Sequence, residues 1–129
     1  MILCDTNILI DFYKNRSDIV GELHQIGYQQ LAISSITQAE LYFGALNKNE
    51  LQQIRGQLSL LERIPVTESI SDRFVGLMED YSLSHKLTIP DGLIAATALI
   101  HSYKLYTLNT RDFHYLPGLR LYKPLTYKG

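Results

Sequence analysis

The sequence predicts an α/β fold in which helices cover both faces of a mainly parallel sheet of about five strands. Short apolar runs alternate along the chain with longer segments whose apolar residues recur at the spacing of an amphipathic helix. Strands separated by helices are joined by right-handed crossovers, which lay neighbouring strands parallel. The chain has 129 residues, 46% of them hydrophobic, so it can bury its own core, and we expect one domain over residues 1–129.

The strand candidates are short and apolar on both sides, as is typical of strands covered on two faces. They are Met1–Cys4, Leu31–Ile33, Ile64–Val66, Leu105–Leu108 and Leu119–Tyr122.

The helix candidates follow from apolar spacing and from start signals. Apolar residues at helical spacing predict helices over Thr6–Tyr13, Asp18–Gln30 and Ser69–His85, and a polar helix is expected near Asn49–Glu62. Ser35 followed by Gln38 is typical of a capping box, so another helix is expected to begin there. Pro90 favours the first turn of a last helix.

Composition excludes several classes of protein. With 12 basic and 13 acidic residues the formal net charge is −1, which excludes a histone-like basic binder and an acidic disordered tail. A lone cysteine, Cys4, excludes an internal disulfide and a four-cysteine zinc site. We expect no membrane span, because the sequence has no apolar run of about 18 residues. The first residues lack the basic leader of a signal peptide, so we expect a cytoplasmic location.

Charge is unevenly distributed along the chain. Residues 101–129 carry five basic side chains against Asp112 alone, and five of the nine tyrosines lie in the same stretch. Basic groups interleaved with aromatic rings suit a nucleic-acid backbone with exposed bases, although a solvated strand with tyrosines on the core has the same pattern. The candidate RNA contacts are Lys104, Arg111, Arg120 and Lys123.

Four acidic residues occupy positions where an open parallel sheet binds its ligands. Asp5 and Asp112 each follow a predicted strand, and Glu40 and Asp91 each fall early in a predicted helix. Each has an ordinary structural explanation, as a helix cap, a turn residue, a solvent-facing side chain or a partner of the helix dipole.

Together the four acids predict a metal site. Carboxylates brought close to one another resist ionisation unless a cation neutralises them, and the cations suited to an all-oxygen site are Mg²⁺ and Mn²⁺. An ion held in this way activates a water and stabilises a phosphoryl transition state, which is the chemistry of phosphodiester hydrolysis. Spacing alone leaves open whether the four residues converge.

Four segments of the chain carry a family resemblance. In order and spacing, ILCDTNILID, SSITQAELYFGA, IPDGLIAATAL and LYTLNTRDF resemble the motif blocks of the PIN-domain ribonucleases, and more narrowly those of VapC toxins of type II toxin–antitoxin modules. The resemblance covers Met1 to about Pro124. It implies an α/β/α sandwich and a metal-dependent endoribonuclease that cleaves tRNA or rRNA.

The resemblance also implies roles for particular residues. The three central acids of the family fall on Asp5, Glu40 and Asp91. The fourth position falls on Asp112, with Asn109 of the same block as a possible substitute. Small polar positions that support the acids fall on Asn7 and Thr107. Gly92 departs from the usual alanine and weakens the start of its helix.

Partners follow from the same resemblance. It implies an antitoxin that covers the acidic pocket, and a homodimer. Three apolar residues on the early helices, Phe12, Tyr13 and Leu46, are expected to be exposed and available for either contact.

Two other functions are compatible with an α/β chain of this length. A receiver-like phosphoacceptor domain also combines acids with Mg²⁺, but the sequence lacks the adjacent acidic pair expected after the first strand. A catalytically silent PIN-like module that binds RNA or protein is the other alternative, and the presence of all four acids argues against it.

Overall fold

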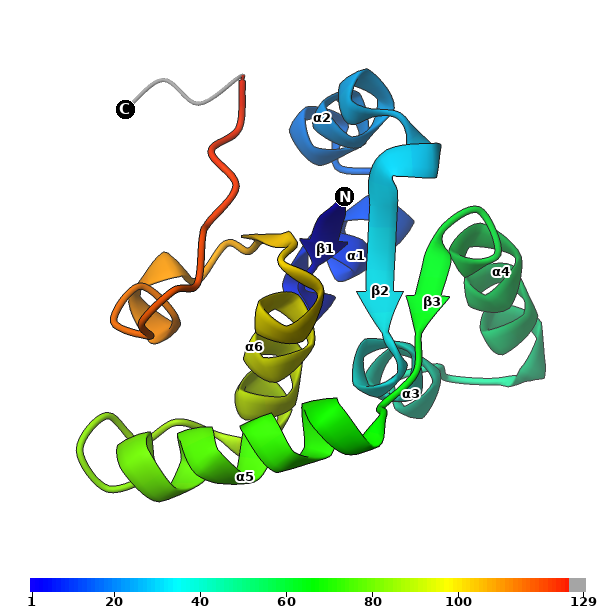
Figure 1. Cartoon of the computed structure of the whole chain (residues 1–129). Coiled ribbons are helices and arrows are strands. Elements are labelled where there is room, and N and C mark those ends of the chain that lie inside the picture. Colours follow the sequence, from blue (N-terminus) through cyan, green and yellow to red (C-terminus); the bar gives the residue numbers. More distant parts are fainter. Residues whose placement is uncertain (126–129) are drawn as a thin grey trace.

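A parallel four-stranded sheet forms the centre of the computed structural model, which describes residues 1–125 (Figure 1). Its strands are β1 (Ile2–Cys4), β2 (Leu31–Ser34), β3 (Glu62–Ile64) and β4 (Lys104–Tyr106), in the spatial order β3-β2-β1-β4. All three strand pairs are parallel, so the carboxyl ends of all four strands lie at one edge of the sheet. The predicted α/β fold with a parallel sheet is confirmed.

The fifth predicted strand is reduced to a single bridge. Leu121 pairs with Leu105, and the backbone bonds beside this bridge run from Leu105 N to Arg120 O at 2.9 Å and from Tyr122 N to Leu105 O at 2.7 Å. Pro124 follows closely, and proline has no N–H to extend a strand ladder. The third strand ends at Ile64 rather than Val66 for the same reason, because Pro65 follows it.

Helices cover both faces of the sheet. They are α1 (Thr6–Tyr13), α2 (Ser17–Ile26), α3 (Ser35–Phe43), α4 (Lys48–Leu58), α5 (Glu68–Tyr81) and α6 (Ile89–His101), with short 3₁₀ turns η1 (Tyr28–Gln30) and η2 (Thr110–Asp112). Side chains alternate along each strand between two cores. Leu3 and Leu105 pack with α5 and α6, whereas Cys4 and Tyr106 pack with α1, α2 and α4. The result is the three-layer α/β/α sandwich implied by the family resemblance.

The start of α3 differs from the prediction by one residue. Ser34, the last residue of β2, is the N-cap, and its Oγ accepts from Ile36 N at 3.2 Å. Ser35, predicted as the cap, is already helical, and its Oγ donates to Ile64 O at 3.3 Å. The strand therefore runs directly into the helix without a connecting loop.

Gly92 lies where α5 and α6 approach closely. A Cβ atom built on Gly92 would lie 3.0 Å from Met78 Sδ and 3.1 Å from the Phe74 ring. The residue that departs from the family pattern is therefore matched by bulky side chains on α5. The helix still forms, with Thr88 as N-cap and Pro90 in its first turn.

Two expectations about surfaces are settled by burial. Phe12 is 5% exposed and packs in the core beside α2, so the expectation that it is exposed is wrong. Leu46 is 85% exposed, as expected. Within residues 1–125 no helix is long and apolar enough to cross a membrane.

The end of the described chain is held by a buried acid. Glu22 on α2 accepts from Tyr122 Oη at 2.5 Å and from Leu125 N at 2.9 Å. The last charged and aromatic residues of the basic stretch, Lys128 and Tyr127, lie outside the described residues.

Candidate active site

The candidate acids lie at the edge where the parallel strands end. Asp5 directly follows β1, and its N–H donates to Tyr106 O at 2.9 Å, at the end of β4. Glu40 belongs to α3, which begins directly after β2. Asp91 lies in the first turn of α6, and Asp112 ends η2, which follows β4.

Asp5 is the most deeply buried of the four acids, at 4% exposure. Its backbone caps α1, and its carboxylate accepts from Thr6 N at 2.8 Å and from Thr107 Oγ1 at 2.7 Å. Thr107 is itself 6% exposed and comes from the segment after β4. The residue is thus both the helix cap that its position suggested and an oriented carboxylate.

Glu40 is held by threonine hydroxyl groups of neighbouring helices. The Thr6 hydroxyl donates to Glu40 Oε1 at 2.7 Å and lies 3.1 Å from Thr37 Oγ1. Thr37 is buried, and Glu40 is half-buried on α3. The contact joins α1 to α3 and turns the Glu40 carboxylate toward the residue that follows Asp5.

Asp91 is positioned by the first turn of α6, and its carboxylate is hydrogen-bonded by the Thr88 side chain. Its N–H donates to Thr88 Oγ1 at 3.3 Å, which is the N-cap bond of α6. Asp91 and Asp112 both line a pocket of about 380 Å³ between η2 and the loop that precedes α6. The two acids that come from distant parts of the sequence therefore share one cavity.

The four carboxylates act on one another electrostatically. Burial, and then repulsion from Asp5 and Asp112, raises the pKa of Asp91 to about 6. Burial also raises the pKa of Asp5, against the hydrogen bonds from Thr107 and Thr6, and with further repulsion from Glu40 and Asp112. Within residues 1–125 no cationic side chain forms a salt bridge with any of the four. The cluster therefore carries negative charge that the described chain does not neutralise.

The donor chemistry fits a hard divalent cation, although the ligand set is not preassembled. Carboxylate oxygens are the ligands that Mg²⁺ and Mn²⁺ prefer. No three acidic, histidine or cysteine side chains in the described part of the chain are yet close enough to share an ion. Glu40 Oε1 accepts from the Thr6 hydroxyl, which holds this carboxylate toward α1. The repulsion and the geometry agree, because carboxylates without a counter-ion hold apart.

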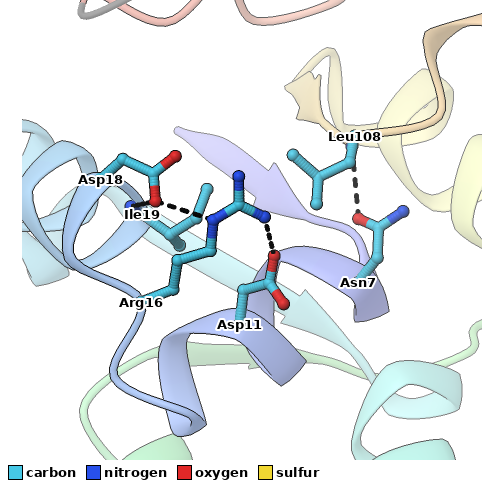
Figure 2. Close-up of polar contacts among 6 residues, drawn as sticks. All are labelled: Asn7, Asp11, Arg16, Asp18, Ile19 and Leu108. Atoms are coloured by element: carbon cyan, nitrogen blue, oxygen red, sulfur yellow. Dashed lines mark hydrogen bonds and ion pairs between the residues drawn. The ribbon is translucent and has the colours of Figure 1, made fainter.

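The predicted supporting residues surround Asp5. Asn7 Oδ1 accepts from Leu108 N at 3.3 Å, which ties α1 to the segment after β4 (Figure 2). Asn109 N donates to Thr107 Oγ1 at 3.0 Å, so the hydroxyl that donates to Asp5 is itself oriented. Figure 2 also shows Arg16 between Asp11 and Asp18, each at 2.9 Å, in the turn that joins α1 to α2.

The structure separates the predicted RNA contacts. Arg111 lines the same pocket as Asp91, and Lys123 lines a neighbouring groove with Thr107. Lys104 begins β4 and so lies at the opposite edge of the sheet from the acids. Arg120 Nη2 donates to the backbone oxygen of Ser102 at 2.7 Å, at the same opposite edge.

Sequence reasoning missed two threonines of the site. Thr6 donates to Glu40, and Thr88 caps the helix that carries Asp91. Thr6 follows Asp5 in the first motif block, and Thr88 stands three positions before Asp91. The second position matches the N-cap spacing and could have been found, whereas the Thr6 contact spans 34 positions and required the fold.

Comparison with known proteins agrees with this arrangement. The model of the PIN domain family matches residues 2–119. "Ribonuclease VapC1" of Methanocaldococcus jannaschii is 32% identical over 124 residues, covering 94% of this chain and 86% of that protein.

Solved structures extend the comparison. One chain of a toxin–antitoxin complex from Klebsiella pneumoniae is 39% identical with a TM-score of 0.78, covering 92% of this chain and 95% of that one. A chain of VapBC2 from Rickettsia felis, solved bound to a promoter DNA fragment, is 27% identical with a TM-score of 0.82, covering 95% and 98%.

A parallel sheet with four acids at its carboxyl edge defines an α/β protein of the PIN class. This chain belongs to the PIN domain family and, within it, to the VapC ribonucleases. Membership decides against the receiver-like alternative, and so does the strand order β3-β2-β1-β4.

Proposed function

We propose that this chain is a metal-dependent endoribonuclease that hydrolyses phosphodiester bonds of tRNA or rRNA, as the toxin of a type II toxin–antitoxin module in the cytoplasm. The observation that carries the proposal is the cluster of Asp5, Asp91, Glu40 and Asp112, which repel one another and have no cationic partner in the described chain. The M. jannaschii relative is named a ribonuclease, which supports the same activity.

The four acids would hold Mg²⁺ or Mn²⁺ through their carboxylate oxygens. Such an ion, when bound, lowers the pKa of a water and stabilises negative charge on the phosphoryl group. The threonines prepare the ligands, since Thr107 orients Asp5 and Thr6 orients Glu40. The raised pKa values of Asp91 and Asp5 show that a neighbouring positive charge would favour the ionised form of both.

Hydrolysis by water predicts the products. Attack by water leaves a 5′-phosphate and a 3′-hydroxyl, whereas attack by the ribose 2′-hydroxyl would leave a 2′,3′-cyclic phosphate. Analysis of the cleavage products therefore distinguishes the two routes.

The decisive experiment compares wild type with Asp5→Asn on a mixed pool of tRNA and rRNA, in Mn²⁺ and in EDTA. We expect cleavage at a few discrete sites in Mn²⁺ only, lost in Asp5→Asn and retained in Asp72→Asn, whose side chain is exposed on α5. Circular dichroism checks that each variant is folded. Cleavage that persists in EDTA or in folded Asp5→Asn would contradict the proposal, and folded wild type that binds RNA without cutting it would favour the silent binding module.

An antitoxin is the proposed protein partner. A groove of about 390 Å³ between α1, α3 and α4 is lined mainly by apolar side chains and reaches Glu40. The similar chain from K. pneumoniae was solved in a toxin–antitoxin complex, which supports a partner of this kind. We expect the antitoxin to slow hydrogen exchange of α1 and α4 amides and to stop cleavage. If the antitoxin inhibits cleavage without protecting the amides of α1 and α4, it binds outside this groove.

A homodimer is the second proposed assembly. Sedimentation of the purified chain tests it directly, and a monomer at all concentrations would contradict it. Leu46 lines the groove and is 85% exposed, so Leu46→Asp separates the two contacts. We expect this variant to lose antitoxin binding and keep the dimer.

A further inference from the structure

The pocket beside Asp91 and Asp112 has a second wall that the proposed metal site does not use. The pocket has a volume of about 380 Å³, and this wall is formed by the loop between α5 and α6 and by the residues after η2. A volume in this range suits a small ligand or a single nucleotide. This wall carries the aromatic rings of His85, His114 and Tyr115 and the basic Lys86, besides Leu87 and Thr88, in contrast to the acids opposite.

Two rings on this wall are stacked. His85 and Tyr115 lie face to face, with ring centroids 4.0 Å apart and an angle of 12° between their planes. Tyr81 supports Tyr115 from the side at 5.5 Å, and Ser84 Oγ lies 2.8 Å from His85 Nδ1. His85 is exposed, while Tyr115 is half-buried against the core. The pair is therefore a fixed aromatic surface at the edge of the pocket rather than part of the core.

Two cations line the same pocket. Lys86 follows His85, and Arg111 precedes Asp112. Neither side chain forms a salt bridge in the part of the chain that the structure describes, where Arg16 makes the ion pairs. Their positive charge is thus available to an anion in the pocket. An aromatic surface beside uncommitted cations is the combination by which proteins hold single-stranded nucleic acid, through stacking of bases and attraction of phosphates.

We propose that this pocket binds one nucleotide of the RNA, adjacent to the phosphodiester that is cleaved. Its base lies on the His85–Tyr115 pair, and its phosphate lies near Lys86 and Arg111. The inference rests on the proposed function for the identity of the polymer, and on the cavity, the stacked rings and the unpaired cations for the site. Because Asp91 and Asp112 line the same cavity, the bound nucleotide would fix which phosphodiester faces the acids.

A mononucleotide tests the site without any cleavage, because AMP contains no phosphodiester. AMP, ribose 5-phosphate and inorganic phosphate are titrated in Mg²⁺ into ¹⁵N-labelled protein, and amide shifts are followed by NMR. We expect AMP to shift residues 84–88 and 110–115 and to bind about tenfold more tightly than ribose 5-phosphate, the contribution of one stacked base. Equal affinity for the two, or shifts confined to other regions, would overturn the inference.

Variants of His85 separate stacking from folding. His85→Ala should bind AMP no better than ribose 5-phosphate, and His85→Phe should restore the preference because it restores a ring. The matched control is His24→Ala, because His24 also contacts a tyrosine ring, Tyr28 at 5.5 Å, but on α2 outside this pocket. Loss of the preference in His24→Ala, or its retention in His85→Ala, would contradict the proposed site.

Cleavage assays distinguish failure of this inference from failure of the proposed function. With an active enzyme, His85→Ala should raise KM for RNA about tenfold with little change in kcat, since it removes binding and leaves the acids intact. Cleavage without any effect of His85→Ala on KM would overturn the nucleotide site and leave the nuclease standing. AMP binding to an enzyme that cuts no RNA would keep the nucleotide site and overturn the nuclease.

Discussion

Hydroxyl groups, rather than basic side chains, hold the carboxylates of the candidate site. Thr107 donates to Asp5 and Thr6 donates to Glu40, both at 2.7 Å. A threonine neutral at every pH orients a carboxylate without cancelling its charge, which leaves that charge for a metal ion. A lysine or arginine in the same place would satisfy the acid and compete with the ion. The site is thus oriented but not neutralised.

Thr107→Val tests this role for the more deeply buried of the two threonines. The change keeps the shape of the side chain and leaves a buried oxygen of Asp5 without its donor, so we expect the free energy of unfolding to fall by about 1–3 kcal/mol. Urea denaturation measures the loss, with exposed Thr110→Val as the control. A change no larger than that of the control would show that the hydroxyl does not orient Asp5.

Asp91 gives the site a pH dependence with a definite sign. Its pKa rises from the ordinary value of 3.8 to about 6 on folding, so its stabilising effect is complete below about pH 4 and is lost as the pH rises through 6. Asp91→Asn removes the free-energy cost of holding a half-buried negative charge beside Asp5 and Asp112. In EDTA the variant should be more stable than wild type by about 1 kcal/mol at neutral pH, allowing for solvent screening of a half-buried group.

The check is thermal unfolding in EDTA at several pH values. The difference between Asp91→Asn and wild type should shrink as the pH falls through 6 and disappear only well below pH 4, where Asp91 is protonated in both the folded and the unfolded chain. Asp72→Asn, an exposed acid on α5, should show no such trend. A variant less stable than wild type at neutral pH would mean that the carboxylate is favourable where it stands.

Element boundaries depend on single residues, and this is where sequence reasoning was least accurate. The strand β3 ends at Ile64, two residues before the predicted end at Val66, because Pro65 cannot donate to the ladder. The capping box at Ser35 and Gln38 had the right residue types, yet Ser34 could also cap, and only the pairing of β2 decides between adjacent serines. The presence of each helix, in contrast to its ends, could be predicted because apolar spacing is set by many residues together.

Alanine variants of Ser34 and Ser35 test which of the two serines caps α3. Ser34→Ala should lower the free energy of unfolding by about 1 kcal/mol, because it removes the acceptor of Ile36 N at the start of α3. Ser35→Ala should cost less, since Ser35 lies inside the helix and its bonds with Ile64 O and Arg63 Nη1 satisfy no N–H group of the first helical turn. Urea denaturation of both variants decides. A larger loss of stability in Ser35→Ala than in Ser34→Ala would show that Ser35 is the N-cap.

At the scale of the whole molecule, the topology brings the acids together. Knowing that parallel strands end at one edge was enough to expect Asp5 and Asp112 near each other, and the electrostatic coupling of all four acids agrees with that expectation. Charge along the chain was a poorer guide to the RNA-facing surface. Lys104 and Arg111 are seven positions apart in the sequence, yet β4 separates them across the length of the sheet.

This separation predicts which basic residues govern RNA binding. Arg111→Gln should lower the slope of log affinity against log salt by about one, because one phosphate contact is lost. Lys104→Gln has the same change in charge at the opposite edge of the sheet and should leave the slope unchanged. Filter binding to uncut RNA in EDTA over a salt series gives both slopes. Equal slopes for the two variants would assign RNA binding to net charge rather than to the pocket.

The hydrogen bond between Thr107 and Asp5 joins residues 102 positions apart. Asp5 follows β1, whereas Thr107 and Asp112 both come from the segment after β4. The contact therefore requires β4 to be paired with β1, a pairing that closes a long loop of the chain. A folding intermediate in which β4 is not yet paired thus carries Asp5 and Glu40 without the Thr107 hydroxyl and Asp112, so the proposed site is complete only when the sheet is complete.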